Sequence, residues 1–169
     1  MTTSRLRVLL LLALLAALPA RAAPTLAELN ERLLAALQRV HGLSDAQMAA
    51  VRAIFARSGF IGKGNPALSV HPDTPAHCGA DPARRPILDG DPAFERICGA
   101  KYMAPLYDPR RERPEDAKVC IDQFEFPDIP CEYPVVWVRA REAALICEAM
   151  GKRLCDAHEW EGACAGRLE

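Results

Sequence analysis

The chain has 169 residues, half of them hydrophobic, and its 21 basic and 22 acidic side chains give a formal net charge of −1. So balanced a charge is not that of the strongly basic nucleic-acid-binding class, and no nucleic acid is expected as a partner. The length is sufficient for one domain with its own apolar core.

The first 22 residues have the pattern of a secretory signal peptide. Arg5 and Arg7 precede eleven apolar residues at 8–18, and Ala-Arg-Ala at 20–22 supplies small residues for cleavage. The alternative is an uncleaved membrane anchor, but a helix needs roughly 20 apolar residues to span a bilayer. The sequence therefore predicts a protein exported to the periplasm, the medium or the cell surface, with no membrane span after cleavage.

All seven cysteines follow the signal peptide. In an oxidising compartment, such cysteines are first expected to form disulfides. The sequence does not fix their pairing, and the odd number allows either a free thiol or a partner beyond Glu169. The disulfide candidates are Cys78, Cys98, Cys120, Cys131, Cys147, Cys155 and Cys164.

Residues 23–58 are predicted to form a helical hairpin. Leucines recur at helical spacing between positions 29 and 37, and Gly42 is placed to end the first helix. Two capping boxes, in which side chain and backbone cap each other, mark the helix starts: Thr25 with Glu28, and Ser44 with Gln47. The hairpin is expected to pack on the rest of the chain or on a partner, and it carries no evident chemistry.

Residues 59–117 are predicted to be an irregular connector. Nine of the fourteen prolines lie between Gly59 and Lys118, and repeated Asp-Pro, His-Pro and Asn-Pro pairs favour turns over helix. Cys78 and Cys98 in this stretch argue against full disorder. We expect a proline-rich segment stapled by disulfides and laid over a core.

The last part of the chain, residues 118–169, shows regular patterns again. Strands are expected at 119–126 and 135–138, followed by a helix at 139–150 that Gly151 ends. Asp156 and Glu159 then form a third capping box. The helix after it is expected to turn three residues inward: Trp160, Ala163 and Cys164.

Several short motifs in this part occur in a specific order. The first is an acidic residue followed by an aromatic-Glu pair, and the second is a Pro-Val-x-x-Val strand leading to a helix with a cysteine. A Gly-Lys-Arg-Leu link and a capped Glu-Trp-Glu helix come next. The residues are Asp122, Phe124 and Glu125; Pro134, Val135, Val138 and Cys147; Gly151, Lys152, Arg153 and Leu154; and Glu159, Trp160 and Glu161.

This order resembles the beginning of the sulfatase-modifying-factor domain, the domain of formylglycine-generating enzymes. The resemblance implies an α+β fold of the irregular C-type-lectin-like kind, of which about fifty residues from Lys118 onward are present. On physical grounds, structural roles are expected for the motif residues rather than substrate contact. Trp160 is expected to be a large core anchor, and Lys152 and Arg153 to reach acidic residues or the last carbonyls of neighbouring helices. The residues given such roles are Asp122, Glu125, Gly151, Lys152, Arg153, Glu159 and Trp160.

Catalytic members of that family oxidise a sulfatase cysteine to formylglycine with a copper ion held by two late cysteines. No residue here matches that pair, so no catalytic, cofactor-binding or metal residue is predicted in this chain, although copper is conceivable for a full-length catalytic member. Two functions stay open. The full-length form is such an oxidase acting on an exported polypeptide, or the protein is a non-catalytic, disulfide-rich module that binds a protein or glycan at the cell surface.

Other candidate sites are weaker. His71, His77, Cys78 and Cys98 fit no regular zinc-finger spacing, and exported cysteines are more often in disulfides. The Gly-Lys-Gly at 62–64 lacks the rest of a phosphate-binding loop. Cys147 is expected on the apolar face of its helix, where thiols are usually inert.

Overall fold

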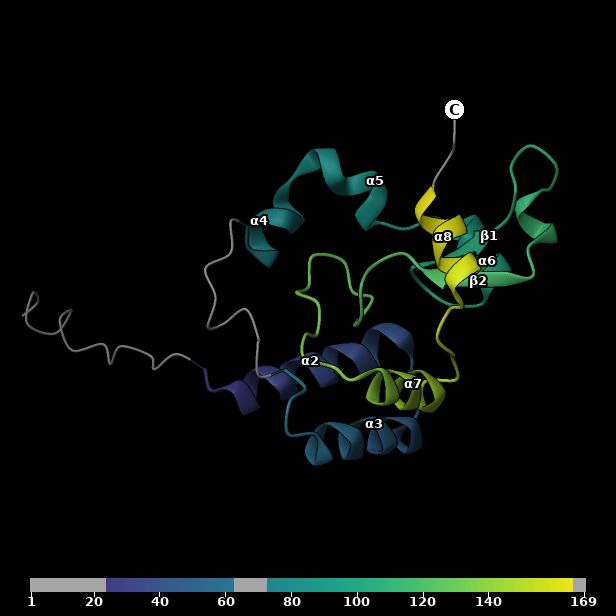
Figure 1. Cartoon of the computed structure of the whole chain (residues 1–169). Coiled ribbons are helices and arrows are strands. Elements are labelled where there is room, and N and C mark those ends of the chain that lie inside the picture. Colours follow the sequence, from purple (N-terminus) through teal and green to yellow (C-terminus); the bar gives the residue numbers. More distant parts are fainter. Residues whose placement is uncertain (1–23, 63–72, 166–169) are drawn as a thin grey trace, which may run out of the picture.

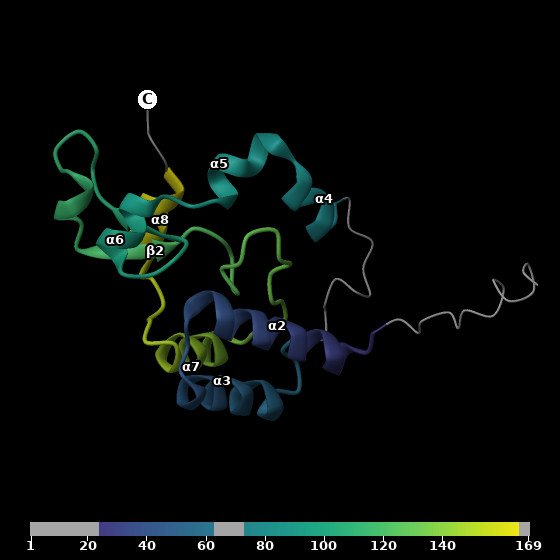
Figure 2. The ribbon, with the colours of Figure 1, turned by 180° about the vertical axis from the view of Figure 1, so that it is seen from behind.

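The computed structural model describes residues 24–62 and 73–165 and has a mixed α and β architecture (Figure 1). Three helices lie together at one end of the molecule, and short helices, a two-stranded sheet and the last helix lie at the other (Figures 1 and 2). Among the described residues, no helix is both long and apolar enough to cross a membrane. The proposed signal peptide, residues 1–22, lies outside the described residues.

The predicted helical hairpin is confirmed. Helices α2 (Leu26–His41) and α3 (Asp45–Arg57) are joined at Gly42, which adopts the left-handed conformation with φ 61°. Both capping boxes form, because the side chains of Thr25 and Ser44 accept the N–H groups three residues on and the side chains there reach back. The helix starts are therefore fixed by local sequence.

The apolar core lies between this hairpin and α7 (Ala140–Ala149), the helix predicted at 139–150. The three helices lie next to one another in both ribbon views (Figures 1 and 2). Phe126, Val135 and Val138 pack against the core from the chain before α7. The buried apolar residues are Leu34, Leu37, Leu43, Met48, Val51, Ile54, Ile61, Ile146 and Met150.

The connector is more helical than expected. It contains α4 (Pro75–Ala80), η2 (Pro82–Arg84), α5 (Arg85–Leu88) and α6 (Pro92–Cys98). The expectation that the X-Pro pairs mark turns alone was wrong, because each of these helices has its proline at one of its first two positions. Proline is tolerated there, since its missing N–H would have no helical partner. In α4, η2 and α6 the residue before the proline is extended and caps the helix. Three caps accept backbone N–H groups in this way: Thr74, Asp81 and Asp91.

A small antiparallel sheet pairs β1 (Met103–Leu106) with β2 (Val119–Asp122), Met103 opposite Asp122 and Leu106 opposite Val119. The short 3-10 helix η3 (Pro114–Asp116) precedes β2. Only the first half of the strand expected at 119–126 forms. The boundary drawn between residues 117 and 118 stays a prediction, and the β1–β2 pairing crosses it.

The strand expected at 135–138 is absent from the structure, and this prediction was wrong. Trp137 has φ 62°, in the left-handed region, which breaks an extended run. Asp128 and Cys131 also have positive φ, and the Phe126–Pro127 peptide bond is cis. Residues 123–139 therefore form an irregular loop that passes over the helical core.

The last helix, α8 (Ala157–Ala165), begins with the predicted capping box of Asp156 and Glu159. The inward face predicted for Trp160 and Cys164 was wrong: Trp160 is 59% exposed and Cys164 is exposed as well. The helix approaches β1 through Gly162, where an added Cβ would lie 3.8 Å from Leu106. Two residues correspond to about 200° around a helix, so Trp160 and Cys164 point away from that contact.

Candidate functional site

Three ionisable side chains meet where the end of β2, the following loop and the end of α7 come together. The Lys152 Nζ lies 2.6 Å from Asp122 Oδ1 and 3.8 Å from Asp128 Oδ2. Asp128 is completely buried, and its Oδ1 accepts a hydrogen bond of 3.2 Å from the Phe124 N–H. We name Asp122, Asp128 and Lys152 the buried charge cluster.

Local backbone geometry places Lys152 in this cluster. Gly151 is left-handed with φ 76°, the Gly151 N–H bonds to the Glu148 carbonyl, and the Lys152 N–H bonds to the Cys147 carbonyl at 2.7 Å. This pair of bonds is the Schellman arrangement that closes a helix and turns the chain. The predicted stop at Gly151 is confirmed, and it directs Lys152 back toward β2.

Two carboxyl groups face one ammonium in the buried charge cluster. Burial, and next the neighbouring Asp122 carboxylate, raise the pKa of Asp128 to about 8. Asp128 is therefore protonated at neutral pH, while Asp122 pairs with Lys152. The Oδ2 atom of Asp128 has no hydrogen-bond partner among the described residues, since the Lys152 ammonium lies 3.8 Å away. The cluster carries little net charge, as a buried site requires.

His41, at the end of α2, links the helical hairpin to the loop that carries Asp128. Its Nε2 lies 2.9 Å from the Pro127 carbonyl oxygen, which only accepts, so Nε2 carries the proton. Burial lowers the pKa of His41, and Nδ1 is buried without a partner. The ring is therefore neutral at neutral pH. Sequence reasoning missed His41 and Asp128, because neither lies in a motif and their importance depends on burial.

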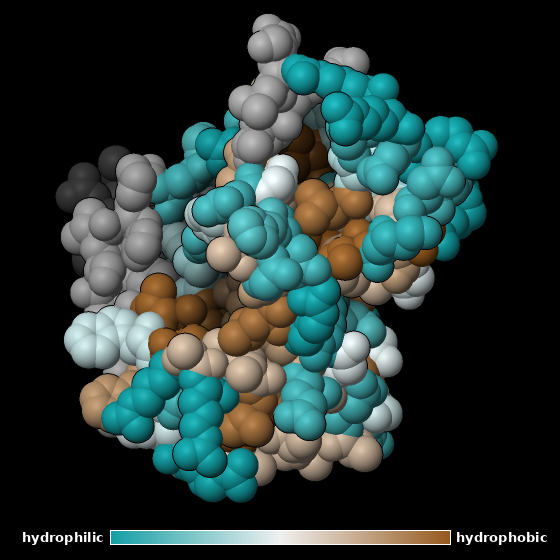
Figure 3. Space-filling view, turned by 45° about the vertical axis from the view of Figure 1, so that its right-hand side comes forward, coloured by the Kyte–Doolittle hydropathy of each residue, from teal (hydrophilic) through white to brown (hydrophobic). Residues whose placement is uncertain are grey.

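A groove with a cavity volume of about 390 Å³ lies beside the N-terminal half of α2. The wall contributed by α2 includes Leu29 and Leu33, and the opposite wall is the stretch Glu132–Val136. Apolar residues on one face of the molecule gather in hollows between hydrophilic ridges (Figure 3). The described residues that line it are Leu29, Asn30, Arg32, Leu33, Gly62, Pro75, Glu132, Tyr133, Pro134, Val135 and Val136.

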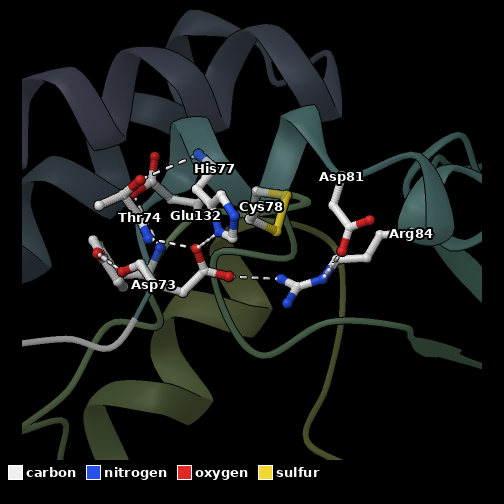
Figure 4. The surroundings of a disulfide bond; sticks show 9 residues. Asp73, Thr74, His77, Cys78, Asp81, Arg84 and Glu132 are labelled. Atoms are coloured by element: carbon white, nitrogen blue, oxygen red, sulfur yellow. Dashed lines mark hydrogen bonds and ion pairs between the residues drawn. A yellow bond between two sulfur atoms is a disulfide. The ribbon is translucent and has the colours of Figure 1, made fainter.

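The Cys78–Cys131 disulfide fastens α4 to the loop after β2, and polar side chains surround it (Figure 4). Asp73 accepts a hydrogen bond from His77 Nδ1 at 2.6 Å and one from Arg84 at 2.9 Å. The His77 bond and then the Thr74 N–H lower the pKa of Asp73. These side chains are largely exposed and include no nucleophile aimed at His77, so the group is a surface network rather than a catalytic arrangement.

The second disulfide, Cys98–Cys120, joins the end of α6 to β2. Four of the seven candidate cysteines are therefore paired, while Cys147, Cys155 and Cys164 are free thiols. A zinc site using Cys78 and Cys98 is incompatible with these bonds. His71 and the rest of the Gly-Lys-Gly stretch after Gly62 lie outside the described residues, and no group of three potential metal ligands occurs within them.

Some of the other motif residues bind neighbouring side chains, and others are exposed to solvent. Arg153 binds Glu159 through two hydrogen bonds of 2.7 and 2.5 Å, and this guanidinium lowers the pKa of Glu159 to about 2. Lys152 and Arg153 thus reach acidic groups, as predicted. Glu125 is exposed, and Trp160 is not the core anchor that was expected.

No family model, curated protein or solved structure matches this chain.

Proposed function

We propose that this chain is part of an exported protein built on a sulfatase-modifying-factor scaffold with an irregular C-type-lectin-like fold. Contacts between the motifs support the proposal. Asp122 of the first motif pairs with Lys152 of the Gly-Lys-Arg-Leu link, and Arg153 of that link pairs with Glu159 of the Glu-Trp-Glu helix. Two disulfides are what an exported chain is expected to form.

On this scaffold, we propose that the chain binds a polypeptide segment rather than carrying out a reaction. The observation that carries the proposal is the groove between α2 and residues 132–136, whose volume falls within the usual range for ligand sites of about 300–1,000 Å³. Aliphatic and prolyl side chains dominate its lining, with Arg32 and Glu132 as charged residues of opposite sign.

A peptide suits this lining better than a glycan. Sugar rings are bound by exposed aromatic faces together with several polar groups. Among the described residues of this lining, only Tyr133 is aromatic, and its hydroxyl donates to the Asp73 carbonyl at 2.7 Å. An extended peptide with apolar side chains would remove the leucine and valine side chains of the groove from water. Its backbone could then bond to Asn30 and Glu132.

A peptide-library selection on the full chain tests the proposal. We expect enrichment of peptides with apolar residues, and Leu33→Glu should weaken the selected peptides about tenfold or more, since a charge would enter an apolar contact. Leu145→Glu is the matched control, because Leu145 is an exposed leucine on α7 that does not line the groove. Equal binding by both variants, or no enrichment at all, would contradict the proposal.

The oxidase activity of the resembled family is the second candidate for the full-length form. The same motif contacts support it, since they support the scaffold on which that activity is found. A cysteine-containing sulfatase peptide incubated with the full-length protein and Cu(I) tests it. An aldehyde captured by a hydrazide probe would support oxidation, and an unchanged peptide would leave binding as the function.

A further inference from the structure

The three free cysteines differ in position and exposure. Cys147 lies three residues before the cap of α7 and is half-buried, Cys155 is exposed in the link that follows, and Cys164 is exposed near the end of α8. Two disulfides already occur in the same chain, as is expected of a chain in an oxidising compartment. The question is which of the three thiols can be joined without moving an element.

Cys155 and Cys164 cannot be joined. Cys155 precedes Asp156, which caps α8, and the helix is regular from Ala157 to Cys164. Seven residues of helix rise about 10 Å, which exceeds the Cα separation of about 7 Å that a disulfide allows. α8 also runs away from α7 toward the end marked C (Figure 1), and Cys164 is the last residue but one of α8.

Cys147 and Cys155 are brought toward each other by the turn at the end of α7. The Lys152 N–H bonds to the Cys147 carbonyl at 2.7 Å, so the chain turns out of α7 only three residues before Cys155. Lys152 is held in place by Asp122, which keeps this turn against the protein. Burial and then Asp122 are the main causes that raise the pKa of the Cys147 thiol, and the Cys155 side chain adds to them.

We propose that Cys147 and Cys155 form a third disulfide, which closes the Gly-Lys-Arg-Leu link into a covalent loop and leaves Cys164 as the odd thiol. The exposed Cys155 thiolate attacks a sulfur of an oxidised disulfide carrier, forming a mixed disulfide and releasing one carrier thiol. Cys147, on losing its proton, attacks the Cys155 sulfur and releases the second carrier thiol. The two cysteines lose two electrons, and the carrier gains them together with the two protons.

The bond would protect the buried charge cluster. Lys152 lies within the loop that it closes, so its ammonium would stay opposite Asp122 and Asp128 even when α7 opens at its end. The inference is independent of the proposed peptide binding, because neither cysteine lines the groove.

The test is to refold the full chain in a buffer of reduced and oxidised glutathione, the latter serving as the carrier, and to alkylate it without reduction. Mass spectrometry of the digest should show a peptide that joins Cys147 to Cys155 and alkylation at Cys164 alone. Cys155→Ser should make Cys147 alkylatable, while Cys164→Ser, the matched control, should keep the joined peptide. Separate alkylation of Cys147 and Cys155, or a bond from either to Cys164 or to a second chain, would overturn the proposal.

Discussion

Two regions of this molecule are held together by different means. The helical region comprises residues 26–61, which include α2 and α3, and α7 with its Met150 cap, and it contains every buried apolar residue of the described core. The stapled region, residues 73–131, contributes none of them but holds both disulfides. Covalent links thus take the place of an apolar core where prolines and short helices leave little to bury.

The buried charge cluster and His41 lie where the two regions meet. Asp128 and Pro127 are fully buried there, and the His41 ring on α2 bonds to the Pro127 carbonyl. The paired groups at this junction bond in one arrangement only, so we expect them to fix how the regions meet more than they add stability. We therefore expect loss of a disulfide, truncation in the apolar core and a change at this junction to affect the stability of the protein differently.

Loss of a disulfide should have the largest effect, and it should fall on the stapled region. Replacing Cys78 and Cys131 by serine should cost about 4 kcal/mol and replacing Cys98 and Cys120 about 3 kcal/mol, because the first bond closes a loop of 53 residues and the second one of 22. Pulse proteolysis in urea measures both costs. An equal or reversed order would break the loop-length explanation.

Truncation of a side chain in the apolar core should have the second largest effect on stability, and it should destabilise the helical region. Leu37 is completely buried in α2, so Leu37→Ala should cost about 3 kcal/mol in the free energy of unfolding. The control Leu145→Ala, at a residue 39% exposed on α7, should change it by less than about 0.5 kcal/mol. Chemical denaturation followed by helical circular dichroism gives both values, and similar losses in the two variants would contradict this core assignment.

A change at the junction should have the smallest effect on the free energy of unfolding, and this effect should depend on pH. The pKa of Asp128 is raised to about 8 from 3.8, so its contribution to stability is fully present below the unfolded pKa and is lost as the pH rises through the folded one. The pKa of His41 is lowered from 6.5, so its contribution is present above pH 6.5 and is lost on acidification. Between pH 6.5 and 8 the Asp128 contribution should therefore fall alone, by about 2 kcal/mol.

Asp128→Asn tests this slope. An amide resembles the protonated acid, and asparagine also tolerates the positive φ of this position. The variant should lose the fall in stability between pH 6.5 and 8, as measured by urea unfolding at a series of pH values. Asp89→Asn, an exposed carboxyl outside the cluster, should keep the slope of the natural protein. A slope unchanged in Asp128→Asn would show that another group causes it.

Local features of the fold could be predicted from the sequence, and features that depend on distant residues could not. The capping boxes at Thr25, Ser44 and Asp156 and the glycine stop at Gly151 depend on neighbours within a few residues. They therefore appear in the structure as predicted. The prolines of the connector were misread because the same X-Pro pair can begin a helix or make a turn.

The buried charge cluster joins residues that lie far apart in the sequence, and no local sequence pattern shows that they meet. Asp122 and Lys152 were singled out as motif residues, but Asp128 became important only when its carboxyl was buried beside both. β1 was missed because Pro105 within it argues against a strand, and its partner lies beyond a turn. Trp160 was placed in the core because of its size, whereas the contact of α8 runs through Gly162 on the opposite side.

Hydrogen exchange of the full chain with and without a reductant tests the division into two regions most directly. We expect reduction to speed exchange in α4, α6, β1 and β2 while α2, α3 and α7 keep their protection. Simultaneous loss of protection in both regions would show that they form one cooperative unit, and unchanged protection in the stapled region would show that the disulfides do not hold it. Either result would contradict the account.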